Sequence, residues 1–217
     1  MNWRSLSSLV LRPGKKPPLQ ELRIGGGSMP ARVRGFCQLG RFHHIEVEDN
    51  VSAYLEYPNG ATGTFVSSTG EAPGTNRFEI VGSRGKLLLE SETLTFARNE
   101  SDMLEFSRTA RLGFAKPEVS NVPIPYENAA NAHATLMQNF VNAILDGEPL
   151  IVPGEEGILS VELANVILYS SLIGQTVELP MDSAAYQKKL NELIAGSRIE
   201  KRVVEVFGED FSKSFRR

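Results

Sequence analysis

The sequence predicts an α+β fold with a large, predominantly antiparallel open sheet and helices packed on one face. Between residues 33 and 124, apolar and polar residues alternate with the period of two that half-buried strands have. From residue 131 onward, apolar residues recur at helical spacing instead. Strands that come first and helices that come after them are typical of α+β domains, whereas α/β domains alternate the two.

Turn residues divide the first region into strands. Val51, Ala53 and Leu55 share one face of a strand, and Asn59-Gly60 after it is a strong hairpin signal. The predicted strands span residues 33–39, 51–57, 61–69, 78–81, 86–90, 93–98, 104–109 and 119–124. This spacing indicates an antiparallel meander of about seven to nine strands.

The second region predicts three helices. An apolar stripe runs through residues 131–147 and stops at a glycine, which is a common helix end. A second helix over residues 153–172 has two glutamates in its first turn, where the helix dipole favours negative charge. After a short strand near residues 176–179, Asp182 is the expected N-cap of a third helix.

These patterns divide the chain into three segments. Residues 1–28 are basic and rich in proline and glycine, so we expect a flexible arm that makes few contacts with the sheet. Deleting this arm should therefore leave the stability nearly unchanged. Residues 29–197 form the predicted α+β domain, and residues 198–217 form a charged C-terminal tail.

Composition limits the classes of function. The chain has 217 residues, 41% of them hydrophobic, which is enough for a sizeable core. A net charge of −3 gives no reason to expect nucleic acid as a partner. Cys37 is the only cysteine, so we expect a reducing, cytoplasmic location without disulfides. No continuous apolar run approaches the ~20 residues of a membrane span, and no signal peptide is evident.

Two motifs that could bind a cofactor or a metal are unconvincing. Gly25-Gly26-Gly27 lacks the sixth-position glycine or alanine of a dinucleotide loop, because Pro30 stands there and no βαβ unit follows. The chain therefore has no recognisable means of holding a nucleotide by itself. In an extended segment His44, Glu46 and Glu48 would share a face, but nothing completes a coordination shell, so we predict no metal site.

The best candidate for a binding site is the polar loop between the predicted strands 61–69 and 78–81. Glu71, Thr75, Asn76 and Arg77 offer the hydrogen-bonding groups that a ligand with many hydroxyls would use. A structural Glu71–Arg77 pair is an equally ordinary explanation of the same residues. His133 begins the first long helix, either packed against the sheet edge or placed as a hydrogen-bond donor for a substrate. We expect the loop to lie beside that helix start.

Five stretches of the sequence together carry a resemblance to a known family. They are residues 45–65, 68–77, 79–87, 138–147 and 154–165. Combined, they resemble the C-terminal domain of the Gfo/Idh/MocA oxidoreductases, the family of glucose–fructose oxidoreductase and inositol dehydrogenase. The resemblance covers roughly residues 29–197.

The resemblance implies a role in sugar or polyol oxidation. Family members join an N-terminal Rossmann domain, which binds NAD(P), to a C-terminal α+β domain that helps form the substrate pocket. Their Glu-Lys-Pro segment, and the helix that carries a catalytic aspartate and histidine, are not visible here, so no catalytic residue is assigned. The chain should bind substrate but no cofactor alone. It would then be a truncated product, a fragment or half of a split enzyme with a separate Rossmann subunit. The alternative is a carbohydrate-binding or assembly module without redox chemistry.

The strand pattern also predicts a homo-oligomer. Neither face of the sheet is plainly polar, and helices can cover only one of them. The face without helices would then be an apolar patch of the kind that marks interfaces. We expect a two-fold, sheet-to-sheet contact, and the resemblance points the same way. The expected contacts are Tyr54, Val66, Val81 and Leu88.

Overall fold

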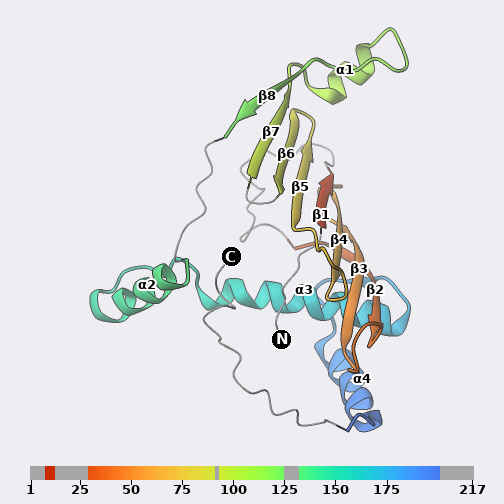
Figure 1. Cartoon of the computed structure of the whole chain (residues 1–217), viewed down its shortest axis with the longest axis vertical. Helices are drawn as coiled ribbons and strands as arrows, with labels where there is room; N and C mark the ends of the chain where they lie inside the picture. Colours follow the sequence, from red (N-terminus) through yellow and green to blue (C-terminus); the bar gives the residue numbers. More distant parts are fainter. Residues whose placement is uncertain (1–7, 13–28, 91–92, 125–131, 201–217) are drawn as a thin grey trace.

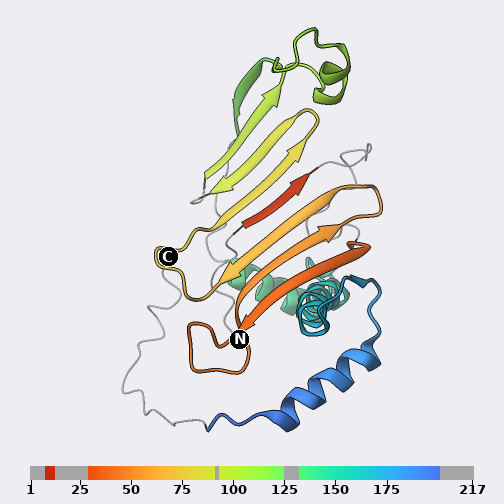
Figure 2. The ribbon, with the colours of Figure 1, turned by 90° about the vertical axis from the view of Figure 1, so that its right-hand side faces the viewer.

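The computed structural model describes residues 8–12, 29–90, 93–124 and 132–200, and it confirms the α+β fold class. The strands form one nine-stranded sheet in the order β8-β7-β6-β5-β1-β4-β3-β2-β9 (Figures 1 and 2). The strands are β1 Ser8–Arg12, β2 Arg32–Leu39, β3 Glu48–Glu56, β4 Thr62–Ser68, β5 Arg77–Gly82, β6 Gly85–Glu90, β7 Thr93–Asn99, β8 Val119–Pro123 and β9 Val177–Glu178. The helices are α1 Met103–Thr109, α2 Ala132–Asp146, α3 Gly154–Ile173 and α4 Ser183–Gly196.

The first strand of the chain occupies the middle of the sheet. β1 pairs antiparallel with β4 and parallel with β5, so it joins the β2–β4 half to the β5–β8 half (Figure 2). The prediction that residues 1–28 make few contacts with the sheet is therefore wrong for Ser8–Arg12. The composition of the segment hid a five-residue strand whose partners lie fifty or more positions further along the chain. Residues 1–7 and 13–28 lie outside the described residues.

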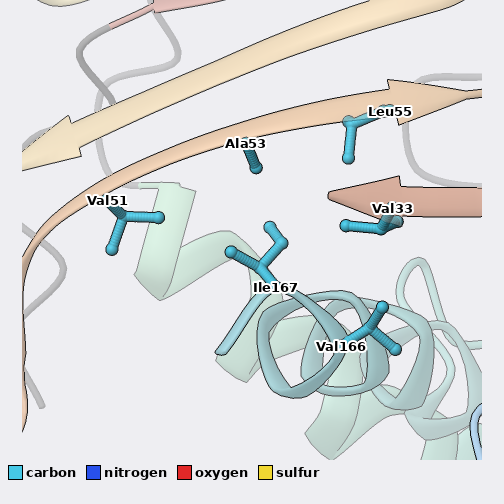
Figure 3. Close-up of a cluster of buried hydrophobic side chains, with 6 residues drawn as sticks. All are labelled: Val33, Val51, Ala53, Leu55, Val166 and Ile167. Atoms are coloured by element: carbon cyan, nitrogen blue, oxygen red, sulfur yellow. The ribbon is translucent and has the colours of Figure 1, made fainter. Parts of the chain in front are cut away.

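The buried core lies between the β2–β3 hairpin and the C-terminal half of α3. Figure 3 shows strand side chains directed at two residues of that helix. The fully or almost fully buried apolar residues are Val33, Val51, Ala53, Leu55, Val166 and Ile167. The alternation predicted for residues 51–57 thus has the expected cause, because every second side chain faces α3.

Gly35 lets α3 approach the sheet very closely. A Cβ atom at this position would lie 2.9 Å from the carbonyl carbon of Ile167 and 3.1 Å from its Cγ2. The backbone N–H groups of Gly35 and Cys37 donate to the hydroxyl groups of Ser170 and Ser171, at 2.9 and 2.7 Å. Burial at this contact raises the pKa of the Cys37 thiol to about 11.

α3 is long and apolar enough to cross a membrane. Core helices of soluble proteins meet the same criteria of length and composition. Here Val166, Ile167 and Ser170 of α3 are buried, and the helix packs on β2. α4 in turn packs on α3, where the ring of Tyr186 meets Tyr169 edge to face and its hydroxyl donates to Asn165 at 3.1 Å. α3 is thus the helix that anchors the helical layer to the sheet.

The other half of the sheet is much less covered. Among the described elements, no helix packs closely on β5–β8, and α2 stands apart from the sheet (Figure 1). Phe78, Ile80, Leu87 and Phe96 lie in register on the face that α3 occupies further along the sheet. That face is therefore apolar beyond the reach of α3.

One predicted strand is a helix. Residues 104–109 fall within α1, because the carboxylate of Asp102 accepts from the N–H groups of Leu104 and Glu105, at 2.9 and 3.3 Å. Ser83 donates to the same carboxylate at 2.7 Å, and this bond is the main reason that the pKa of Asp102 is lowered. The remaining predicted strands and helices match the structure to within a few residues.

Candidate functional site

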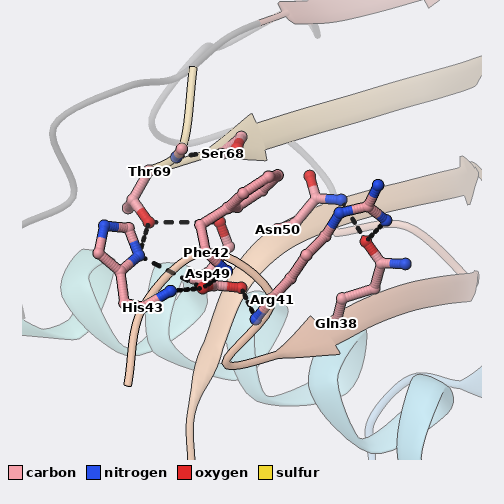
Figure 4. A network of polar contacts seen from close by, with 9 residues as sticks. Gln38, Arg41, Phe42, His43, Asp49, Asn50, Ser68 and Thr69 are labelled. Carbon is pink, nitrogen blue, oxygen red and sulfur yellow. Dashed lines mark hydrogen bonds and ion pairs between the residues drawn. The ribbon is translucent and has the colours of Figure 1, made fainter. Parts of the chain in front are cut away.

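The carboxylate of Asp49 organises the loop that joins β2 to β3. Its side chain is fully buried, and its two oxygens accept from the backbone N–H groups of Arg41, Phe42 and His43, at 2.9, 2.7 and 3.0 Å. Burial by itself raises the pKa of a carboxyl group, but these three donors outweigh it and lower the pKa of Asp49. An ionised, buried acid therefore fixes residues 40–47 at this end of the sheet (Figure 4).

The same carboxylate orients the imidazole of His43. Nδ1 of His43 lies 3.3 Å from Oδ2 of Asp49 and 3.4 Å from Oγ1 of Thr69. An ionised carboxylate can only accept, so Nδ1 of His43 is the donor in this contact. Figure 4 shows the second nitrogen, Nε2, turned away from Asp49, and the His43 side chain is 47% exposed. With the ring in its neutral form, Nε2 is placed to accept a hydrogen bond from a ligand.

Neighbouring contacts fix the rest of the loop. A Cβ atom at Gly70 would lie 2.7 Å from Cδ1 of Phe42, so the ring needs a glycine there. Oε1 of Gln38 accepts from Arg41 and from Asn50, both at 2.6 Å. The contact of Phe42 with Gly70 joins the β2–β3 loop to the segment that follows β4, and the Gln38 bonds join the loop to β2 and β3.

The loop is also tied to the end of the helical layer. The carboxylate of Glu46 accepts from the hydroxyl of Ser197 and from the N–H of Arg198, the latter at 3.0 Å. The Ser197 hydroxyl is the main cause of the lowered pKa of Glu46. Glu46, one of the residues considered above for a metal, thus has a structural partner. Within the part of the chain that the structure describes, no three His, Cys, Asp or Glu side chains are grouped to hold a metal ion.

The structure brings only part of the predicted binding set together. Glu71, Thr75 and Asn76 are exposed on the loop that begins immediately after Thr69, next to the His43 loop. Arg77 is not paired with Glu71: it donates to Glu79 at 2.5 Å and to Glu90 at 3.2 Å. Arg77 could bind a ligand or form a structural ion pair. The structure favours an ion pair, with Glu79 and Glu90 as the partners in place of Glu71.

His133 is exposed on α2, and Figure 1 shows α2 apart from the sheet. The proximity of His133 to the loop at Glu71 therefore stays a prediction. No sequence pattern predicted that His43, Asp49 and Thr69 lie together. The only signal was a buried-face aspartate one residue into a strand, preceded by a polar segment with two histidines.

Comparison with known proteins identifies the domain. Residues 24–179 match the model of the Gfo/Idh/MocA oxidoreductase family, C-terminal alpha/beta domain. A search of curated proteins found no match. Many solved structures are similar, among them an NAD-binding protein from Listeria innocua, with a TM-score of 0.54 and 16% identity over 80% of this chain and 59% of that one.

Two similar structures are WlbA dehydrogenases in complex with NADH and UDP-GlcNAcA. The enzyme from Chromobacterium violaceum has a TM-score of 0.54 and 15% identity, covering 83% of this chain and 56% of its own. The enzyme from Bordetella pertussis has a TM-score of 0.51 and 15% identity, with the same coverage of 83% and 56%. At this identity the likeness establishes the fold alone, and the chain spans less than three fifths of these proteins. Because the family model matches most of its length, the chain belongs to the Gfo/Idh/MocA oxidoreductases, as a C-terminal α/β domain of that family.

Proposed function

We propose that this chain is the substrate-binding and oligomerisation part of an NAD(P)-dependent oxidoreductase that acts on a sugar or polyol. The observation that carries the proposal is the match of residues 24–179 to the C-terminal domain of this oxidoreductase family. The cofactor would be held by a nucleotide-binding domain outside these residues, such as a Rossmann subunit in the cytoplasm. The redox step then needs both domains.

The end of the sheet around His43 and the loop after β4 is the proposed contact region for the substrate. Nε2 of His43 would accept from a substrate hydroxyl, and the exposed groups of Glu71, Thr75 and Asn76 would bind neighbouring hydroxyls. Arg77 supports this loop from the sheet through its two ion pairs. His133, the remaining predicted contact, lies on α2 and would need to approach from there.

Two titrations test this proposal. We expect the purified chain to bind a panel of sugars and sugar nucleotides weakly by ligand-observed NMR, and to bind neither NADH nor NADPH. Glu71→Gln and Asn76→Ala should weaken sugar binding by roughly fivefold each, about 1 kcal/mol per lost hydrogen bond. Asn121→Ala, at an exposed asparagine on β8, is the matched control and should change nothing.

The outcomes separate the alternatives. Tight binding of NADH or NADPH by the chain alone would contradict the proposal of a separate nucleotide-binding subunit. Sugar binding that survives every loop variant would place the contact region elsewhere. If the chain binds sugars but no nucleotide-binding polypeptide from the same source restores turnover, the chain is instead a carbohydrate-binding module without redox chemistry.

We further propose that the face of the sheet opposite α3 mediates a two-fold homodimer. The strand registers put Tyr54, Val66, Val81 and Leu88 on this one face, and Tyr54 is exposed. The same face carries a cluster of ion pairs. Arg77 pairs with Glu79 and Glu90, and Lys86 pairs with Glu79. A mixed apolar and charged surface of this kind can pair with its own copy.

Light scattering at micromolar concentration tests the dimer. Val66→Asp and Val81→Asp should each convert dimer to monomer, whereas Leu112→Asp, at an exposed loop residue, should not. A wild-type chain that is monomeric and soluble would refute this contact.

A further inference from the structure

The loop that carries His43 is fixed at two separate points. At the first, the carboxylate of Asp49 in β3 accepts from the backbone N–H groups of residues 41–43. At the second, the carboxylate of Glu46 accepts from the hydroxyl of Ser197 and from the N–H of Arg198. These two donors lie 151 and 152 positions further along the chain. The second anchor is therefore a long-range contact, which the loop and its neighbouring strands cannot supply.

The donors of the second anchor come immediately after α4, a helix that is itself fixed to the core. Asp182 caps the start of α4 by accepting from two backbone N–H groups of its first turn, at 2.9 and 3.1 Å. The ring and the hydroxyl of Tyr186 then bind the helix to α3. A helix of 14 residues is about 21 Å long, so α4 extends from this contact with α3 to the loop. Figure 2 shows the chain passing the loop as it leaves α4.

The carboxyl group of Glu46 is suited to an anchor. The Ser197 hydroxyl, and after it the N–H of Arg198, lower its pKa, so it is ionised at neutral pH. The hydroxyl donates to Oε2 and the N–H donates to Oε1, the latter at 3.0 Å. Glu46 is exposed, where water competes with any single hydrogen bond, but two donors on different oxygens also fix the orientation of the carboxylate.

Hydrogen bonds inside the loop carry the position of Glu46 to His43. Ile45, the residue before Glu46, donates its backbone N–H to the carbonyl of His43 at 2.9 Å. Val47, the residue after it, accepts from the N–H of Gly40 at 3.1 Å. The ring contacts of His43, at 3.3 and 3.4 Å, are longer than these bonds, so the backbone sets where the ring points. A shift of Glu46 therefore turns the imidazole.

We propose that Glu46 is a positioning residue for His43, and that the segment after α4 thereby belongs to the sugar contact region. Without the contact to this segment, the loop keeps its Asp49 anchor, but its other half moves and His43 points toward a ligand only part of the time. Affinity then falls with the fraction of molecules in the binding orientation. That His43 meets a sugar rests on the proposed function, whereas its positioning by Glu46 does not.

Amide hydrogen exchange measured by NMR tests the positioning without any ligand. Glu46→Ala should speed exchange at Gly40 and Ile45, whose N–H groups close the loop, by about tenfold, as in a local opening. The N–H of Phe42, which Asp49 holds, should exchange at nearly the wild-type rate. Unchanged exchange at both Gly40 and Ile45 would overturn the inference.

Two further variants test the donor side of the anchor. Arg198→Pro removes the donating N–H, and Ser197 already has the backbone that precedes a proline, with φ −62° and ψ 132°. This variant should also speed exchange at Ile45, but less than Glu46→Ala does, because the Ser197 hydroxyl remains. Glu200→Ala, at an exposed acid just beyond the anchor, is the matched control and should not speed it. Equal exchange in Arg198→Pro and Glu200→Ala would count against the inference.

A double-mutant cycle on ligand binding separates positioning from direct contact, with D-glucose and myo-inositol as the probes. His43→Ala should weaken binding by about fivefold, as expected for one lost hydrogen bond. Glu46→Ala should weaken it by roughly two- to fivefold, since a residue that acts through His43 costs no more than His43 itself. In the His43→Ala background, Glu46→Ala should weaken binding no further. Equal weakening in both backgrounds would refute the positioning role.

The two measurements distinguish failure of the inference from failure of the proposed function. If the wild type binds no sugar or polyol but Glu46→Ala speeds exchange at Ile45, the anchor is supported and the proposed function is refuted. If the probes bind and Glu46→Ala changes neither exchange nor affinity, the inference alone is refuted. Glu46→Gln keeps one acceptor oxygen, so it should recover part of the loss, and it replaces Glu46→Ala if that variant does not fold.

Discussion

Replacing Gly35 by alanine should separate α3 from the sheet. The added Cβ would lie far inside van der Waals contact with the carbonyl oxygen of Ile167, and 2.9 Å from its carbonyl carbon. Neither group is the flexible end of a side chain, so the helix or the strand must move. That movement lengthens the hydrogen bonds from Gly35 to Ser170 and from Cys37 to Ser171.

The magnitude follows from these contacts. Overpacking a close contact typically costs 1–3 kcal/mol, and each weakened hydrogen bond adds about 1 kcal/mol. We therefore expect Gly35→Ala to lower the free energy of unfolding by about 3 to 5 kcal/mol. With an m-value of about 2 kcal/mol/M, the urea midpoint should fall by roughly 1.5 to 2.5 M.

Urea unfolding followed by circular dichroism measures this change, with Gly157→Ala as the matched control. Gly157 also lies in α3, but nothing lies within 4 Å of the Cβ that alanine would add. That substitution should stabilise the chain by about 0.5 to 1 kcal/mol through helix propensity. If Gly35→Ala unfolds within 0.5 kcal/mol of the wild type, α3 does not depend on this close approach.

Three further predictions concern single groups. Asp49 has a lowered pKa, so its contribution to stability is present above the unfolded pKa of about 4 and is lost as the pH falls further. Asp49→Asn should therefore flatten the decline of Tm at acid pH and speed amide exchange at residues 41–43. An equal decline of Tm in both proteins would contradict this. The thiol of Cys37, whose pKa is about 11, should react with iodoacetamide at pH 8 far more slowly than a free cysteine. Gly35→Ala should speed this reaction. Rapid labelling of the wild type would show that the contact with α3 is open. Arg77→Gln should lower Tm by leaving Glu79 and Glu90 without their cation, with no effect on sugar binding, and a loss of binding at unchanged Tm would return Arg77 to the contact set.

The parts of the fold that sequence could predict are those held by local patterns. Alternation and turn residues located most strands, because hairpin neighbours such as β5 and β6 are close in the sequence. Leu104 and Phe106 also alternate with polar residues, so residues 104–109 have a strand pattern although the Asp102 cap makes them a helix. β1 escaped prediction because its partners are remote and its flanking residues resemble a linker.

The candidate site was harder to predict, for a physical reason. Asp49 gains its role from three backbone N–H groups of a loop, and no side-chain pattern encodes where a loop will place them. The pairing of Arg77 could have been deduced. A tight turn from Gly82 to Gly85 sets the register that puts Arg77 directly opposite Glu90, and Glu79 lies two residues along the same face.

The place of β1 has a consequence for how the chain reaches its fold. β2 to β4 and β5 to β8 are each made of neighbouring strands, so each half can form early from short-range contacts. Ser8–Arg12 leaves the ribosome before either half, yet it must wait for both Thr62–Ser68 and Arg77–Gly82 before it has a place. Joining the halves is then the late, long-range step of folding. A chain shortened by its first twelve residues should still form both halves, but with two open sheet edges where one strand belongs, and such edges favour aggregation.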